Sequence, residues 1–297
     1  MFAYDSYYTM MKKYTISVLL LILGSVTSCS SGCASSKPLE VVSQNKLPRK
    51  SFVQIRHAIA MEGCKIDPET KKKKCQQAVG RSVSSGAYVF ISEVSYDTAY
   101  VLTAGHSCQN KVPKRQVIDG HTIKNLGSKF RVVNLDGTSN KAEVVSINNR
   151  YDLCVLRISN VLLHRPVIKT ALSPPIPGEL VYNLAAPHGL YWPNAVLLFR
   201  GIFSGYHTKG YSIYTIPTKP GSSGSPIVNK SGNLIGVIFA GYPVIENVGL
   251  SSPLAAIKIF LKKSIAKGEM ELWEEINRPV EGRTAVGRWL KDLNIKL

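Results

Sequence analysis

Acidic residues are scarce in this chain. Asp and Glu together number 19 among 297 residues, against 37 Lys and Arg, and the formal net charge is +18. Such a balance favours contact with anionic surfaces, whether lipid head groups, polysaccharide or nucleic acid. No motif of interleaved aromatic and basic residues accompanies the charge, so we expect non-specific adhesion and no specific nucleic-acid site.

Long hydrophobic runs are also scarce. The run near the N-terminus covers residues 16–23 and follows Met10-Met11-Lys12-Lys13. A basic stretch before an apolar run too short to span a bilayer is typical of a signal peptide, which we place at residues 1–28. No second run of this kind appears, so nothing indicates a protein with several membrane spans. Met10 or Met11 is an alternative start of the chain.

The end of this segment, Val26-Thr27-Ser28-Cys29, resembles the bacterial lipobox, in which the Cys becomes acylated. Cleavage before Cys29 would leave a lipid-anchored protein in the cell envelope, facing the periplasm or the exterior. A plain signal peptide cut nearby, which implies secretion, and an uncleaved anchor are the alternatives. Residues 29–50 are rich in Ser, Lys and Pro and lack an apolar period, so we expect a flexible tether.

Cysteine is limited to six residues, and their use favours an oxidising compartment. Cys29 is assigned to lipid. Cys33 is left over, and it is either free or, if the lipobox is misplaced, the modified residue. Cys64 and Cys75 bracket a polar segment with turn residues, which a disulfide would close as a loop.

Three short motifs carry the chemistry of the chain. They are Thr103-Ala104-Gly105-His106, Tyr151-Asp152-Leu153-Cys154-Val155-Leu156 and Gly221-Ser222-Ser223-Gly224-Ser225-Pro226. Together they supply an imidazole, a carboxylate and a hydroxyl in the chain order His, Asp, Ser. That order is the one found in the chymotrypsin-like double barrel, whereas other folds carry the same triad in other orders.

The roles follow from the chemistry of each side chain. A serine hydroxyl is a weak nucleophile at neutral pH, so an imidazole must take its proton and a carboxylate must orient that imidazole. We assign His106 as the base, Asp152 as its orienter and Ser223 as the nucleophile. Glycines around Ser223 permit a tight turn, and we assign the oxyanion hole to the amides of Gly221 and Ser223.

These motifs resemble the T-A-[AG]-H, D-[LI]-A-[LV]-[LI] and G-[DN]-S-G-[GS]-P segments of trypsin-like peptidases. A Ser after the second Gly of the nucleophile loop, here Ser225, is similar to bacterial glutamyl endopeptidases and high-temperature-requirement protease domains. The resemblance covers about residues 50–265. It implies a serine endopeptidase that acts through an acyl-enzyme on protein or peptide substrates, with no metal and no organic cofactor.

The chain departs from the family pattern at Ser222, where relatives carry Asp or Asn. In trypsin-like enzymes that Asp pairs with the new N-terminal amine after zymogen cleavage. Ser222 offers no such partner, so the resemblance implies an active site that is formed without zymogen activation.

The residues that match the family's primary specificity pocket are Pro217, Thr218, Ile238 and Ala240. Glutamyl endopeptidases carry a His where Ile238 stands, and a trypsin-like pocket has an Asp where Pro217 stands. We therefore expect a small or apolar residue before the scissile bond. Lys219 leaves an acidic preference open, and Ile238 fits equally well as a core residue.

The triad also bears on the remaining cysteines. Cys108 follows His106 by two positions and Cys154 follows Asp152 by two. If the triad forms, these cysteines are neighbours and a disulfide between them is expected. A metal site built from His106, Cys108 and Cys154 is the alternative, but it would consume the general base.

The coarse pattern of strands indicates an all-β body of two six-stranded antiparallel barrels with a C-terminal helix. Strand-like runs cover residues 86–91, 99–103, 129–133, 141–145 and 180–184. We place a protease domain at residues 51–265, with one barrel at about 51–160 and the second at about 161–265. Helical spacing appears at 254–261 and around 270–276.

The helical tail at residues 266–297 is too short for a peptide-binding domain, which argues against the high-temperature-requirement proteases that append one. A catalytically inactive protease-fold lipoprotein that binds peptides or anionic surface polymers is the alternative function. The histidines outside the motifs are expected to be surface or structural residues: His57, His121, His164, His188 and His207.

Overall fold

A computed structural model describes residues 47–67, 69–109, 115–118, 121–161 and 165–278. The predicted signal peptide, Cys29 and Cys33 lie outside the described residues, as do His164 and the chain after 278. Among the described residues, no helix combines the length and the apolar character needed to cross a membrane.

The first barrel is antiparallel and closed by six strands. In ring order these are β1 (Phe52–Ile66), β2 (Lys73–Ile91), β3 (Ala99–Ala104), β7 (Leu153–Ile158), β6 (Ser139–Asn148) and β5 (His121–Asn134), and β1 pairs with β5 to close the ring. A short strand, β4 (Arg115–Ile118), pairs with the outer edge of β5. Alternate side chains, such as Val53, Tyr88 and Leu156, point inward and form the buried core.

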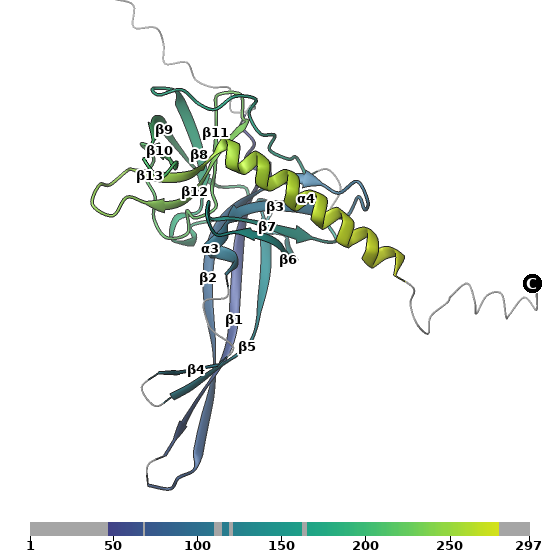
Figure 1. The fold of residues 1–297 in the computed structure, drawn as a ribbon, viewed down its shortest axis with the longest axis vertical. Coiled ribbons are helices and arrows are strands. Elements are labelled where there is room, and N and C mark those ends of the chain that lie inside the picture. The colour runs from purple at the N-terminus through teal and green to yellow at the C-terminus, as the bar shows by residue number, and fades with distance from the viewer. Residues whose placement is uncertain (1–46, 68, 110–114, 119–120, 162–164, 279–297) are drawn as a thin grey trace, which may run out of the picture. The chain divides into compact units, whose positions relative to one another are not determined.

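The second barrel is also closed and six-stranded. Its ring order is β10 (Ser212–Tyr214), β13 (Gly249–Pro253), β12 (Leu234–Gly241), β11 (Pro226–Val228), β8 (Leu180–Ala185) and β9 (Leu197–Tyr206). Its core contains Val181, Phe203, Tyr214 and Ile238. The predicted fold class, two six-stranded antiparallel barrels followed by a helix, is confirmed (Figure 1).

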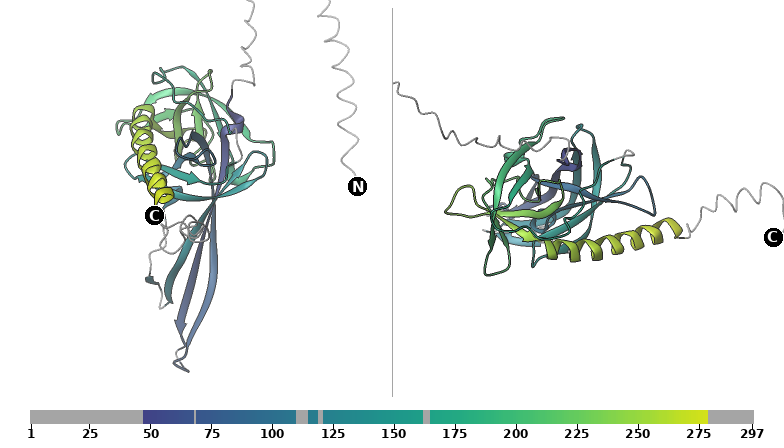
Figure 2. Two further views of the ribbon diagram at one scale, coloured as in Figure 1. Left: turned by 90° about the vertical axis from the view of Figure 1, so that its right-hand side faces the viewer. Right: turned by 90° about the horizontal axis from the view of Figure 1, so that it is seen from above.

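The C-terminal helix α4 (Leu254–Asn277) is continuous, whereas the sequence indicated two separate helical stretches. It packs against strands of both barrels, as Figure 2 shows from two sides. The Tyr100 hydroxyl donates to Glu269 Oε1 at 2.8 Å, and Arg157 of β7 pairs with Glu275 at 2.9 Å. These contacts fix the helix against the first barrel. Three short helices complete the described elements: η2 (Arg49–Ser51), α3 (Gly105–Cys108) and η3 (Pro187–Gly189).

Strands β1, β2 and β5 continue beyond the first barrel as a long twisted arm (Figure 1). The β1–β2 ladder runs without interruption from Phe52↔Ala87 to Ile66↔Lys73. Cys64 and Cys75 are directly opposed in this ladder and form a disulfide with their Cα atoms 4.1 Å apart. The predicted disulfide between Cys64 and Cys75 is therefore present, and its two cysteines lie near the ends of the strands that flank the turn.

Candidate active site

His106 and Asp152 are brought together by two neighbouring strands. β3 ends at Ala104 and β7 begins at Leu153, and these two residues are paired in the antiparallel ladder. The segments that follow β3 and precede β7 therefore lie at the same end of the barrel. Asp152 Oδ2 lies 2.6 Å from His106 Nδ1, and Asp152 Oδ1 accepts the His106 backbone N–H at 2.6 Å.

The residue before His106 must be small for this contact to form. A Cβ atom added at Gly105 would lie 2.9 Å from Asp152 Oδ1, closer than side chains tolerate. Asp152 itself adopts φ of +50°, in the left-handed region that most residues avoid. The backbone of this turn is thus shaped so that the carboxylate reaches the ring.

A disulfide joins Cys108 of α3 to Cys154 of β7, with a Cα–Cα distance of 6.4 Å. It ties the short helix that carries His106 to the strand that follows Asp152. Because both sulfurs are oxidised, they do not present thiolates, and the alternative metal site with His106 lacks its ligands.

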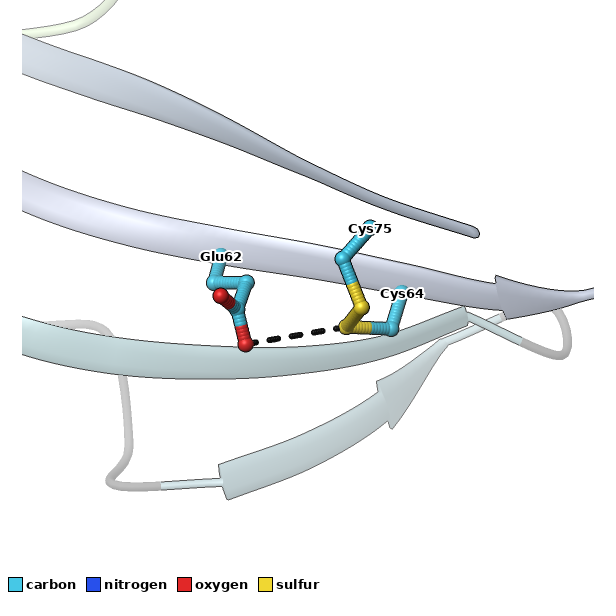
Figure 3. Close-up of side chains that lie close together, drawn as sticks. All are labelled: Glu62, Cys64 and Cys75. Atoms are coloured by element: carbon cyan, nitrogen blue, oxygen red, sulfur yellow. Dashed lines mark hydrogen bonds between the residues drawn. A yellow bond between two sulfur atoms is a disulfide. The ribbon is translucent and has the colours of Figure 1, made fainter. Parts of the chain in front are cut away.

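Within the described ranges, one group of residues has the spacing of metal ligands, namely Glu62, Cys64 and Cys75 of the arm. Figure 3 shows that the two cysteines are bonded to each other and that the Glu62 carboxylate lies beside the Cys64 sulfur, 3.7 Å away. A disulfide sulfur is a poor metal ligand, so this group is a covalent staple of the arm.

Ser223 lies in a tight loop between β10 and β11. Gly221 and Gly224 adopt φ of +96° and +85°, which glycine tolerates without a steric penalty. The Ser223 carbonyl accepts the amide of Ser85 at 2.8 Å, and the Gly224 amide donates to Ile238 at 2.6 Å. The loop that carries Ser223 is therefore hydrogen-bonded to a strand of each barrel, β2 and β12.

His106 and Ser223 line one cleft of about 390 Å³, together with Gly221 and residues at the base of the arm. In the part of the chain that the structure covers, no hydrogen bond joins the Ser223 hydroxyl to the His106 ring. Such bonds are often long in enzymes without substrate and shorten in the complex. The two side chains thus share the cleft, and the His106–Asp152 pair is already formed.

A backbone contact orients the predicted oxyanion hole. The His188 amide donates to the Pro220 carbonyl at 2.5 Å. The Pro220 carbonyl and the Gly221 N–H belong to the same trans peptide group and point in opposite directions, so the Gly221 amide is directed away from His188. Neither the Gly221 nor the Ser223 amide donates to any acceptor in the described segments, so both are available to a ligand.

His188 was expected to be a surface or structural residue, and its contribution to the site comes from its backbone amide. Its backbone holds the Pro220 peptide, with His188 at φ of +53° in η3. No side-chain motif signals a contact of this kind, which is why inspection of the sequence missed it.

The four predicted specificity residues differ in burial: Ile238 is buried, whereas Pro217, Thr218 and Ala240 are half-buried. Ile238 is 1% exposed and belongs to the barrel core, which agrees with the alternative that it is a core residue. A Cβ at Gly249 would lie 3.0 Å from Thr218 Cγ2, and one at Gly241 would collide with Thr218 Oγ1. Pro217 and Thr218 line a second cavity of about 310 Å³ beside the 241–247 loop, and Ala240 is half-buried nearby.

Lys219 was a candidate ligand for an acidic substrate side chain. Its ammonium lies 3.5 Å from Glu246 Oε1, and both side chains are exposed. The pair is weak, so an acidic substrate group would compete with Glu246 for the same cation.

His57 forms part of the cleft wall at the base of the arm. It is 5% exposed, stacks on Phe130 with ring centroids 4.1 Å apart, and its Nε2 has no partner among the described residues. Burial lowers the pKa of His57 below its usual value, because the charged imidazolium loses its hydration.

Two closed antiparallel barrels, with His106 and Asp152 on one and Ser223 on the loop of the other, define the chymotrypsin-like class of fold. Residues 85–237, more than half of the chain, match the family model of the trypsin-like peptidase domain. The chain belongs to the trypsin-like peptidase family.

Curated relatives agree with this family. The chain is 26% identical over 194 residues to the serine protease Do-like HtrA of Bacillus subtilis, which covers 61% of this chain and 43% of that protein. It is 28% identical over 185 residues to the chloroplastic protease Do-like 1 of Arabidopsis thaliana, covering 55% and 39%. The chain therefore spans less than half the length of these relatives. The expected similarity to high-temperature-requirement protease domains fits these matches.

A solved structure supports the fold. The serine endoprotease from Yersinia pestis superposes with a TM-score of 0.53 at 22% identity, covering 76% of this chain and 68% of that one. At this level of identity the likeness concerns the fold alone.

Proposed function

We propose that the protein is a serine endopeptidase that hydrolyses peptide bonds through an acyl-enzyme. The observation that carries the proposal is the carboxylate–imidazole pair, with 2.6 Å between Asp152 Oδ2 and His106 Nδ1, in the same cleft as Ser223. A carboxylate on Nδ1 leaves Nε2 unprotonated and able to accept the serine proton.

In this mechanism Ser223 Oγ attacks the substrate carbonyl while its proton passes to His106 Nε2. The resulting imidazolium is stabilised by Asp152. The amides of Gly221 and Ser223 donate to the oxyanion, a contribution of about 3–4 kcal/mol per donor in comparable sites. The imidazolium then protonates the leaving amine, and water, deprotonated by His106, hydrolyses the acyl-enzyme and regenerates the hydroxyl of Ser223.

For the residue before the scissile bond we propose a small or apolar side chain. Thr218 is packed between Gly241 and Gly249, which leaves little depth there, and the core residue Ile238 offers no polar ligand. A peptide-library cleavage profile tests this preference. Enrichment of Glu before the cleaved bond would instead support the glutamyl-endopeptidase resemblance, with Lys219 as the cation.

We further propose that the protein is anchored in the cell envelope by acylation of Cys29. The support is the sequence Val26-Thr27-Ser28-Cys29 after a basic and then apolar segment. Mass spectrometry of the N-terminal peptide tests it, with a diacylglyceryl-modified Cys29 expected. An unmodified N-terminus cut elsewhere would contradict lipidation.

The proposed activity is tested by incubating the protein with a peptide library and identifying the new termini. We expect cleavage by the wild-type chain and none by Ser223→Ala. If a folded wild-type protein cleaves nothing yet binds peptides or anionic polymers, the inactive binding module is the correct function.

A further inference from the structure

Two buried polar side chains lie opposite each other in the ladder of β1 with β2. They are Gln54 and Ser85, which are directly paired and are 2% and 0% exposed. Burial of a polar group costs free energy unless the group is hydrogen-bonded. Each of these side chains donates its hydrogen bond to a carbonyl of the second barrel, close to the predicted oxyanion hole.

The Ser85 hydroxyl acts both as a donor and as an acceptor. It donates to the Gly221 carbonyl at 2.8 Å and accepts the backbone amide of Ala186 at 3.1 Å. The backbone amide of Ser85 also donates to the Ser223 carbonyl at 2.8 Å. One residue of the first barrel thus binds two carbonyls of the loop that carries the proposed nucleophile.

The bond to Gly221 restrains a residue that has little conformational restraint of its own. Gly221 has φ of +96°, and glycine adopts many backbone conformations because it lacks a Cβ atom. The peptide before Gly221 is held by the His188 amide on the Pro220 carbonyl, and the peptide after it is held by the Ser85 hydroxyl. Together the two bonds fix both peptides that flank Gly221, and with them the direction of the Gly221 amide.

The segment that supplies the His188 amide is held from the first barrel as well. Gln54 Nε2 donates to the Gly189 carbonyl at the end of η3, at 3.1 Å. At the start of η3 the Ala186 amide donates to the Ser85 hydroxyl. Both ends of η3 therefore depend on the same pair of buried side chains.

We propose that Ser85 is a positioning residue, whose hydroxyl holds the loop from Pro220 to Ser223 in the conformation that presents the Gly221 amide to the oxyanion. The inference rests on the proposed peptidase function. Ser85 is fully buried and is not among the residues that line the cleft, so it acts through Gly221 and not by contact with the substrate. Gln54 supports the same loop through η3.

This role predicts a particular kinetic signature. A donor to the oxyanion stabilises the transition state more than the bound substrate, so its misalignment lowers kcat and leaves KM nearly unchanged. Loss of a whole donor costs about 10²–10³-fold in kcat in comparable sites. Ser85→Ala leaves the donor in place but unsupported, and we expect a fall in kcat of about 10- to 100-fold with KM within about twofold of the wild type.

The first test compares kcat and KM for the library peptide that the wild type cleaves best. It is joined by an inhibitor probe, the trifluoromethyl ketone built on the residues before the cleaved bond. Ser223 Oγ bonds to the ketone carbon, its proton passes to His106, and the ketone oxygen becomes an oxyanion in the hole. The inhibition constant should rise in Ser85→Ala by the factor by which kcat falls. Binding of the uncleaved peptide to Ser223→Ala should be the same with and without Ser85→Ala, whereas a general loss of structure would weaken both.

The matched control is Ser264→Ala on α4. Ser264 is 1% exposed, and its hydroxyl has no hydrogen-bond partner among the described residues. This substitution removes the same atom from a buried site away from the cleft, so kcat and the inhibition constant should not change. Thermal unfolding establishes that each variant is folded.

A second variant, Gln54→Met, tests the same support from the other side. Methionine has a similar length but cannot donate to the Gly189 carbonyl, so η3 loses one of its two anchors. We expect kcat to fall by about three- to tenfold with KM unchanged. If Ser85→Ala does not fold, this variant decides the question, and a wild-type kcat in Gln54→Met would then overturn the inference.

The outcomes separate this inference from the proposed activity. An active wild type together with a folded Ser85→Ala variant of the same kcat and inhibition constant, or with a loss in KM alone, would overturn the role of Ser85 and leave the peptidase standing. A folded wild type that cleaves no peptide and does not react with a fluorophosphonate would refute the peptidase, and the role of Ser85 with it.

Discussion

One carboxylate holds His106 at two points. Asp152 Oδ2 lies 2.6 Å from the ring nitrogen Nδ1, and Oδ1 accepts the backbone amide of the same residue at 2.6 Å. The ring orientation and the start of α3 are thus fixed by a single side chain. Asp152 makes both contacts but is not among the residues that line the cleft. Its replacement therefore tests the arrangement of His106 without changing the lining of the cleft.

Asp152→Asn should retain the fold and lose catalysis. An amide of the same shape can still contact the backbone amide of His106, but it does not stabilise the imidazolium and favours the wrong tautomer. The expected fall in kcat is about 10⁴-fold, the size seen for this substitution in a comparable triad. The measurement is hydrolysis of the best library peptide, with thermal unfolding as the control. Activity within tenfold of the wild type would show that Asp152 does not orient the base.

Gly221→Ala should disable the oxyanion hole. Gly221 has φ of +96°, and its added Cβ would lie 2.5 Å from the Ala186 carbonyl oxygen and 2.9 Å from the His188 amide. The peptide that presents the Gly221 amide must therefore shift, and a fall of about 10²–10³-fold in kcat is expected for one lost donor.

The matched control for this substitution is Gly210→Ala. Gly210 has a similar φ of +81°, but open space surrounds its added Cβ. It carries the backbone strain without the collision and should leave kcat unchanged. Equal losses of activity in the two variants would point to strain alone.

Removing the Cys108–Cys154 disulfide should destabilise the fold and the site together. For the sequence separation of 46, loop-closure entropy predicts a loss of about 4 kcal/mol in the free energy of unfolding. The double variant Cys108→Ala, Cys154→Ala should also lower kcat, because α3 is no longer tied to β7. Guanidinium unfolding and peptide hydrolysis measure the two effects.

The disulfide of the arm provides the comparison. Cys64→Ala with Cys75→Ala opens a separation of 11 residues, for which the same relation predicts about 3 kcal/mol. Since Cys64 and Cys75 are not among the residues lining the cleft, kcat for short peptides should be unchanged. A larger effect on activity here than at Cys108 and Cys154 would contradict the assigned roles.

Stability should fall in mildly acidic solution because of His57. Its pKa is lowered by burial in the folded state, so below the unfolded value of about 6.5 the unfolded chain binds more protons than the folded one. The folded state therefore loses stability as the pH drops through that value toward the lower folded pKa. His57→Phe should remove this component, so that the variant loses less stability than the wild type between pH 8 and pH 5 in guanidinium titrations. Identical pH dependence would exclude His57 as the source.

The two barrels and the pairings Cys64–Cys75 and Cys108–Cys154 could be predicted from the sequence. Strands were predicted from the alternation of apolar and polar residues. The Cys108–Cys154 disulfide was predicted because each cysteine follows a triad residue, His106 or Asp152, by two positions. The pairing of β3 with β7 then brings both pairs together. The catalytic assignment of His106, Asp152 and Ser223 stays a prediction, supported by this geometry.

The arm, and the backbone contact between His188 and Pro220 that orients the Gly221 amide, could not be predicted from the sequence. Of residues 65–74, which are rich in Lys with turn residues among them, only 65–66 and 73–74 lie in strands, and the described residues between them form the turn that this composition favours. The length of the arm could not be predicted, because it depends on the pairing of β1 with β2 and β5 and not on a local pattern. The contact of His188 with Pro220 involves only backbone atoms, so no side-chain pattern could reveal it.

The central claim is that an alcohol at position 223 is made nucleophilic by the imidazole at 106. The most direct measurement is the rate at which a fluorophosphonate modifies the folded protein, with the site identified by mass spectrometry. The account predicts one adduct, on Ser223, that disappears in Ser223→Ala and forms at least a thousandfold more slowly in His106→Ala. A folded wild-type protein that resists the reagent, or reacts as fast without His106, would contradict it.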